Sequence, residues 1–189
     1  MSKKWSEHYW HSIPCMKARI EELARLCAGT VLEVGCNDGF LTQCIRERGL
    51  EVTGVEISLP AIAQAKVQFG DDFPIVHGDA CKLPFGDGTF DTVVGGEILE
   101  HLENPGTGLA EMFRVARQQV ILSLPIGHYW LGEPTHLWEL HGETVEHDQG
   151  MLRPIAKELL ILQWEKRRRW ENGQVVDLPG WNYDPEKTL

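Results

Sequence analysis

Three acidic residues stand at matching places in the chain, each at or near the end of an apolar segment. Glu33 lies in "VLEVGCNDGF", Glu56 ends "VTGVE" and Asp79 ends "PIVHGD". At such positions a carboxylate can accept hydrogen bonds from ribose hydroxyls, and an aspartate can bind an adenine amino group. Glu33 directly precedes a glycine-containing loop, where a carboxylate would repel a pyrophosphate but would suit an ammonium group. The three acids therefore indicate a nucleoside ligand with a cationic extension and no phosphates.

The loop after Val34 is suited to close contact with such a ligand. Gly35 and Gly39 carry no Cβ, so a ligand can approach their backbone. Asn37 stands between them, and asparagine is one of the few residues that tolerate a left-handed backbone, so the turn is retained. S-adenosylmethionine is a nucleoside of the required chemistry, and the pattern predicts a site for it.

Methyl transfer from a sulfonium requires an acceptor atom held close to the methyl group, and a hydroxyl acceptor also needs a base. His101 is the expected catalytic base, since histidine titrates near neutral pH. An alternative interpretation is a metal site made of Glu97, Glu100, His101 and His136. The first three are spaced i, i+3, i+4 and would share one face of a helix, and two oxygens with two nitrogens suit a divalent metal. The favoured interpretation has no metal and expects Glu100 to be solvated.

Alternating strands and helices are expected to position these residues. Apolar runs predict strands at 30–34, 51–56, 74–79, 90–96 and 119–125, and helical spacing predicts helices at 16–27, 40–48, 58–69 and 104–116. A short helical segment is expected between the fourth strand and the last helix. Such alternation is typical of a parallel sheet covered on both faces, which binds ligands at the carboxyl ends of its strands.

The chain after Pro125 has weaker signals. We expect an irregular segment, then a strand around 137–145 that turns at 148–150 into a second strand within 158–169; a helix after Pro154 is the alternative for that second segment. The predicted organisation is one domain over residues 1–170 with a C-terminal extension over 171–189.

Composition excludes several classes of protein. The net charge of −10 argues against broad nucleic-acid binding, with "KRRR" at residues 166–169 as a local exception. The five cysteines have no C-x-x-C spacing, which fits a reducing cytoplasm better than a disulfide framework or a zinc site. No apolar run approaches 18 residues, so we expect no membrane span and no secretion signal.

Between residues 31 and 125 the chain resembles the class I S-adenosylmethionine-dependent methyltransferases. "LEVGCNDG" resembles their E/D-x-G-x-G-x-G motif, with Asn37 in place of the middle glycine, and "VTGVEIS" resembles their ribose-binding motif. "HGDACKLPF" resembles their adenine motif, and "FDTVVGGEILEHLENP" resembles the segment over the methionine end. The resemblance implies an α/β Rossmann-like fold with a largely parallel seven-stranded sheet, helices on both faces and a C-terminal antiparallel strand pair.

The resemblance also implies roles for individual positions. The backbone of the first loop and Glu33 would hold the methionine end, Glu56 the ribose, and the segment from Asp79 the adenine. The cofactor-binding residues expected in this way are Glu33, Gly35, Cys36, Asn37, Gly39, Glu56, Ile57, Asp79, Ala80, Leu83, Gly95 and Glu97.

The expected function is methyl transfer from S-adenosylmethionine to an oxygen, or a nitrogen, of a small molecule. The four residues of the alternative metal site resemble the metal centre of small-RNA 3′-terminal 2′-O-methyltransferases, which leaves an RNA acceptor open as the less favoured partner. A cofactor-binding partner subunit without activity is a third possibility. We expect a cytoplasmic monomer or homodimer without a membrane partner, whose acceptor pocket uses the segments "WSEHYWH" and "GHYWLGEPTHLW".

Overall fold

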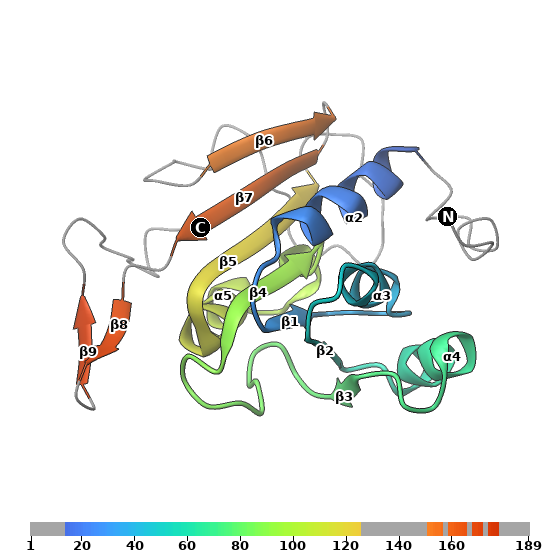
Figure 1. Ribbon diagram of the computed structural model, residues 1–189, viewed down its shortest axis with the longest axis horizontal. Helices are drawn as coiled ribbons and strands as arrows, with labels where there is room; N and C mark the ends of the chain where they lie inside the picture. Colours follow the sequence, from blue (N-terminus) through green and yellow to red (C-terminus); the bar gives the residue numbers. More distant parts are fainter. Residues whose placement is uncertain (1–13, 126–150, 157–158, 166–167, 172–173, 178–189) are drawn as a thin grey trace.

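A single twisted sheet organises the chain (Figure 1). The computed structural model describes residues 14–125, 151–156, 159–165, 168–171 and 174–177, with side chains described from 16 to 124. Its strands lie in the order β3-β2-β1-β4-β5-β7-β6. Their bounds are β1 Val31–Val34, β2 Val52–Glu56, β3 Ile75–His77, β4 Phe90–Gly96, β5 Ala116–Pro125, β6 Met151–Ala156 and β7 Leu159–Glu165.

The strands from β1 to β5 are parallel, and the path of the chain reverses direction across the sheet at β1. From β1 the chain moves to β2 and β3 on one side, and then returns to place β4 and β5 on the other side. Such a switch point leaves a crevice outside the carboxyl ends of the adjacent strands, because the connections there leave in opposite directions. The loops after β1 and β4 therefore define the place where a ligand is expected.

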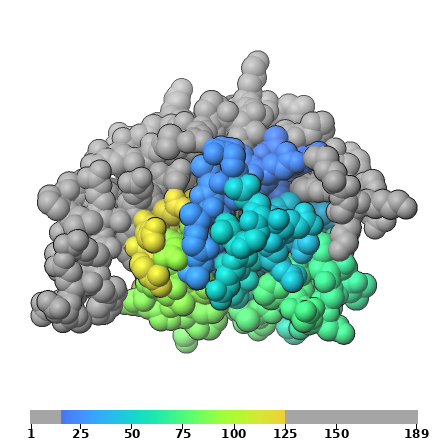
Figure 2. Space-filling view, viewed as in Figure 1, coloured from blue at the N-terminus to red at the C-terminus, as the bar shows by residue number. Residues whose placement is uncertain are grey.

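Helices cover both faces of this sheet. The helices are α2 Pro14–Leu26, α3 Phe40–Glu47, α4 Leu59–Phe69 and α5 Pro105–Val115, with a short 3-10 turn, η2, at Leu99–His101. Helices α2 and α3 lie side by side over one face, as Figure 2 shows, and pack on Val31, Val94 and Ile121. Helix α5 covers the opposite face, and α4 packs near β3. Alternate residues of β1, β4 and β5 therefore pack on opposite faces, against different helices, as the pleat requires.

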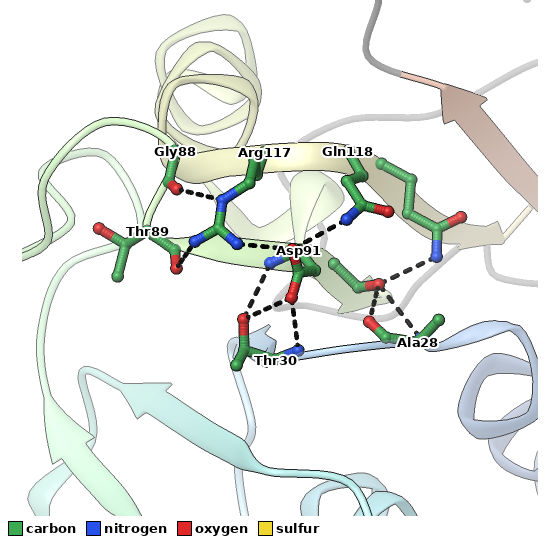
Figure 3. A network of polar contacts seen from close by, with 9 residues as sticks. Ala28, Thr30, Gly88, Thr89, Asp91, Arg117 and Gln118 are labelled. Carbon is green, nitrogen blue, oxygen red and sulfur yellow. Dashed lines mark hydrogen bonds and ion pairs between the residues drawn. The ribbon is translucent and has the colours of Figure 1, made fainter. Parts of the chain in front are cut away.

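A polar network ties together the amino ends of the central strands (Figure 3). One carboxylate oxygen of Asp91 accepts hydrogen bonds from Thr30 N and Thr30 Oγ1, each at 3.0 Å. Its other oxygen accepts from Arg117 Nη1 at 2.8 Å and from Gln118 Nε2 at 2.9 Å. Asp91 thus links the starts of β1, β4 and β5, and these hydrogen bonds lower the pKa of its carboxyl group. This network aligns the strands from the end opposite the ligand crevice.

The predicted Rossmann-like fold, with a mostly parallel sheet and flanking helices, is confirmed. Most element boundaries lie within two residues of the prediction, and the largest shift is at β5: α5 ends at Val115, and β5 begins at once with Ala116 rather than at Gln119. The prediction placed Ala116 on the helix because its apolar side chain suits either environment. Within the described ranges, no helix has the length and apolar character needed to cross a bilayer.

The predicted C-terminal antiparallel strand pair is present, but the partner of its second strand is not the predicted one. Segment 159–165 is a strand, as favoured, and not the alternative helix, but it pairs antiparallel with β5 and with β6 at Met151–Ala156. The expected partner at 137–145 and the expected turn at 148–150 both lie outside the described residues. Pro154 lies within β6, an edge strand, where a missing N–H is tolerated.

A separate hairpin follows the sheet. Strand β8, Arg168–Glu171, pairs antiparallel with β9, Gln174–Asp177. Glu171, where the predicted extension begins, is the last residue of β8. Part of the basic "KRRR" run therefore lies on a strand, and residues 174–177 of the predicted extension are paired in this hairpin.

Candidate functional site

The loop after β1 has the backbone conformation that its residues predict. Gly35, Asn37 and Gly39 all have positive φ, with values of 72°, 45° and 81°. The left-handed conformation expected for Asn37 is thus confirmed. A Cβ on Gly35 would lie 2.5 Å from Ile98 Cδ1, and a Cβ on Gly39 would lie 2.5 Å from Phe73 Cε1. Glycine is therefore required at both positions, and the contact with Ile98 brings the loops after β1 and β4 together.

Cys36 is held in this loop by its backbone and its side chain. Cys36 N and Gly35 N both donate to the carbonyl of Val55, at 3.0 and 2.9 Å. The thiol is buried against Gly54, where a Cβ would lie 2.7 Å from Cys36 Sγ, and burial raises the pKa of the thiol. A buried, protonated thiol is a packing group, so what Cys36 can offer a ligand is its backbone.

Glu56 connects the ends of β1 and β2. Its Oε2 accepts a hydrogen bond from Asn37 N at 2.9 Å, and its Oε1 accepts from Ser58 N at 2.8 Å. Ser58 in turn caps α4 by accepting from Ala61 N. A carboxylate has about four lone-pair sites, so each oxygen can still accept a hydroxyl hydrogen bond. The two backbone amides therefore orient Glu56 without using up its capacity to bind a diol.

The expected adenine residues divide into exposed and buried groups. Ile57 is 63% exposed beside Glu56, and an exposed apolar side chain at this edge is free to cover a flat ring. Asp79 Oδ1 accepts from Cys81 N at 2.8 Å, which shapes a turn after β3. Ala80 and Leu83 are buried in the main core cluster. Leu83 N donates to Glu111 on α5 at 2.8 Å, so Leu83 has a packing role whether or not it also lies under a ligand.

Glu33 is buried on the face of β1 that α3 covers. Thr42 Oγ1 donates to Glu33 Oε2, and the side chain is only 4% exposed. Burial raises the pKa of Glu33 to about 8, and the Thr42 hydrogen bond and the charge of Arg19 oppose this rise. A nearby cationic ligand would favour the ionised form of Glu33.

Glu97 has an unusual conformation at the end of β4. Its φ is 55°, which is rare for a residue other than glycine or asparagine and is found where function imposes strain. Glu97 Oε2 forms an ion pair with Arg19 Nη1, and Glu97 N donates to Ser123 O at 3.0 Å. Gly95, two residues earlier, faces the α5 side, where a Cβ would lie within 3.0 Å of Ile98, Leu122 and Met112.

Arg19 is a site residue that the sequence analysis missed. It lies on α2, its residue is 9% exposed, and its charge acts on both Glu33 and Glu100. A signal was available: Arg19 is three residues after Met16 and four before Leu23, so it shares the apolar face of the helix. An arginine in that pattern is buried with its partners rather than solvated.

The predicted helical face of Glu97, Glu100 and His101 is wrong. The turn η2 includes only Leu99–His101, and the left-handed Glu97 precedes it, so the three residues do not have i, i+3, i+4 helix geometry. Among the described residues, no group of three His, Cys, Asp or Glu side chains could hold a metal ion. His136, the fourth predicted ligand, lies outside the described residues, as do the two aromatic segments expected to form the acceptor pocket.

Glu100 is buried, although the favoured interpretation expected it to be solvated. Its residue is 0% exposed, and neither carboxylate oxygen has a hydrogen-bond partner among the residues that the structure describes. Burial raises the pKa of Glu100 to about 8, the charge of Glu97 adds to this rise, and the charge of Arg19 opposes it. The short 3-10 turn explains the difference, because it places Glu100 on the inner side, next to buried Leu99, while His101 remains partly exposed.

Comparisons with known proteins agree with this fold. Residues 32–124 match the family model described as "Methyltransferase domain". A protein of Mycolicibacterium smegmatis, named a probable S-adenosylmethionine-dependent methyltransferase, is 31% identical over 59% of this chain and 42% of its own length. The ubiquinone biosynthesis O-methyltransferase of Pseudomonas paraeruginosa is 32% identical over 55% of this chain and 47% of its own length. The chain thus spans about half the length of these relatives or less.

A solved structure extends the likeness in fold. The magnesium protoporphyrin IX methyltransferase of Synechocystis, with bound SAH, superposes with a TM-score of 0.60 at 15% identity. The match covers 84% of this chain and 87% of that one. At this low sequence identity, the match supports a similar fold and nothing more. The matched family model, the named relatives and the strand order around β1 together support a class I S-adenosylmethionine-dependent methyltransferase domain over residues 32–124.

Proposed function

We propose that this chain binds S-adenosylmethionine at the carboxyl ends of β1, β2 and β4 and transfers its methyl group to an oxygen of a small molecule. The observation that carries the proposal is the orientation of Glu56 by Asn37 N and Ser58 N, at 2.9 and 2.8 Å. This arrangement holds a carboxylate at the end of β2 with lone pairs left for two ribose hydroxyls. In support, the ubiquinone biosynthesis relative is named an O-methyltransferase.

Each part of the cofactor has a complementary residue in this proposal. Glu56 would accept hydrogen bonds from the ribose, Ile57 would cover the adenine ring and Asp79 would accept from the adenine amino group. Glu33 would face the methionine ammonium, which favours its ionised form. The donor supplies the activated methyl carbon, so the chain's own task is to hold the acceptor in line with the carbon–sulfur bond.

His101 is the proposed base for a hydroxyl acceptor. It ends η2, just after β4, and it is partly exposed, so a substrate proton could reach it. Histidine is the side chain that most often serves as a general base in enzymes. The less favoured proposal, a metal-dependent RNA methyltransferase, has less support because Glu97, Glu100 and His101 do not form a metal-binding group.

Calorimetry and methyl transfer together test this function. The purified protein should bind S-adenosylhomocysteine (SAH), the product that remains after methyl transfer. The expected Kd is in the micromolar range, about −8 kcal/mol, and NAD should bind much more weakly. Labelled methyl groups should pass from S-adenosylmethionine to members of a panel of small phenols and alcohols, with no loss of activity after treatment with a chelator. Absence of SAH binding would refute the proposal. Transfer to RNA alone, abolished by chelator and restored by manganese, would favour the RNA alternative.

A further inference from the structure

A cluster of buried polar atoms without partners lies beside the proposed cofactor site. Within the described part of the chain, these buried atoms make no hydrogen bond: Arg19 Nε, Glu97 Oε1, Ser123 Oγ and both carboxylate oxygens of Glu100. Arg19 Nη1 contacts Glu97 Oε2 as an ion pair but outside hydrogen-bond geometry. A buried polar group left unpaired destabilises the folded state, so a cluster of them requires a specific reason, such as a ligand or bound water.

The four residues come together from three parts of the fold. Ser123 lies on β5 in register with Gly96, and a Cβ on Gly96 would be 3.8 Å from Ser123 Oγ and 3.2 Å from Leu23 on α2. Ser123 therefore lies on the sheet face that α2 covers. The ion pair brings Arg19 of α2 to Glu97, and the charges of both act on Glu100. The cluster thus lies at the carboxyl ends of β4 and β5, next to the switch point.

We propose that these residues, Arg19, Glu97, Glu100 and Ser123, form the polar subsite for the methyl acceptor, and that the group bound there is a neutral hydroxyl. This inference rests on the proposed function, and it names the substrate class for the same site. A hydroxyl is one donor and an acceptor at once, so it can donate to Glu100 while accepting from the arginine.

Other ligand groups match the cluster less well. A carboxylate only accepts, so it would leave the oxygens of Glu97 and Glu100 unpaired and would compete with Glu97 for Arg19. An ammonium only donates, so it would leave Arg19 Nε unpaired and would add a second buried cation next to the guanidinium. A metal ion is disfavoured because the described acids and histidine do not form a metal-binding group.

Binding of phenol and anisole to the SAH-saturated protein tests this assignment directly. The two probes differ by one methyl group on the oxygen, which removes the donor and keeps the acceptor. Phenol should bind at least tenfold more tightly than anisole, measured by NMR titration, and more tightly than benzoate or benzylamine. Three results would overturn the proposal: equal binding of phenol and anisole, no binding of phenol, or preferred binding of benzoate or benzylamine. The first two would indicate that bound water alone satisfies the cluster.

Variants of Glu100 assign the effect to a residue. Glu100→Gln keeps the shape but replaces one carboxyl oxygen with an NH2 group, which cannot accept a hydrogen bond, so phenol affinity should fall about tenfold. SAH affinity should stay within about twofold, which also reports that the variant is folded. Glu103→Gln changes an exposed acid three residues later and should alter neither affinity.

A second variant covers the case in which Glu100→Gln does not fold. Ser123→Ala removes only the buried hydroxyl and should also weaken phenol binding without weakening SAH. Unchanged phenol binding in a folded Glu100→Gln protein would refute the role of Glu100. If the wild-type protein does not bind SAH at all, the proposed function is refuted instead. Failure of the acceptor subsite and failure of the proposed function are therefore distinguishable.

Discussion

Asn37 N donates a hydrogen bond to Glu56 Oε2 at 2.9 Å, which joins the loop after β1 to the end of β2. The bond depends on two local conditions. Asn37 must adopt its left-handed backbone, with φ of 45°, and Glu56 must be held from the other side by Ser58 N. The shape of the proposed cofactor site is therefore determined by contacts between its own loops before any ligand is bound.

Replacement of Glu56 should weaken cofactor binding strongly. Glu56→Ala removes a charged acceptor for the ribose and leaves Asn37 N without its partner, so SAH binding should weaken by about 1.5–3 kcal/mol. Isothermal calorimetry measures this directly. Glu51→Gln, an exposed acid near the start of the same strand, is the matched control and should bind SAH like the wild type. Similar affinities for the two variants would contradict the ribose assignment.

Position 37 should tolerate glycine and not a β-branched residue. Asn37→Gly can keep the positive φ, so stability and SAH affinity should change little. Asn37→Val should lower the free energy of unfolding by about 1–2 kcal/mol, because a side chain branched at Cβ disfavours the left-handed region. Urea denaturation of the two variants makes the comparison. A valine variant as stable as the glycine variant would show that the loop adopts another conformation.

Asp91 should matter for stability and not for binding. Asp91→Asn replaces one of two accepting oxygens in the network of Figure 3 with a donor, so contacts with Thr30 or with Arg117 are lost. We expect a loss of about 1–3 kcal/mol in the free energy of unfolding. Because the wild-type pKa is lowered, this contribution should be present above the ordinary aspartate pKa and should decline as the pH falls through the lowered value. A large loss of SAH affinity in the folded variant would contradict a purely structural role.

Glu100 should destabilise the protein increasingly as the pH rises. Burial raises the pKa of Glu100 from 4.5 to about 8, so in this window the folded state holds a proton that the unfolded state has lost. Stability therefore falls with pH by about 1 kcal/mol per unit between these values. Glu100→Gln removes this slope, so its advantage over the wild type should be near zero below the unfolded pKa and largest near pH 8. Denaturation of the wild type and the variant at several pH values tests this. Glu103→Gln keeps Glu100, so its stability should still fall as the pH rises.

Much of the fold could be predicted because its signals are local. The apolar strands, the helix starts at Ser58 and Asn104, and the left-handed Asn37 follow from the period of the side chains and from capping chemistry. The strand at 159–165 was also predicted, from its apolar run. Its partners were not, because strand pairing depends on which segments meet in space rather than on either sequence alone.

The sequence by itself determined the class of fold, the acids at the strand ends and the loop that joins them, since these depend on residue type and spacing. Only the tertiary structure decided that Arg19 pairs with Glu97 and that Glu100 is fully buried. Spacing along the chain says that a residue can lie on a given face. What covers that face depends on the packing of α2, η2 and β5, which are distant in sequence, and this packing determines both the partner and the exposure of each charge.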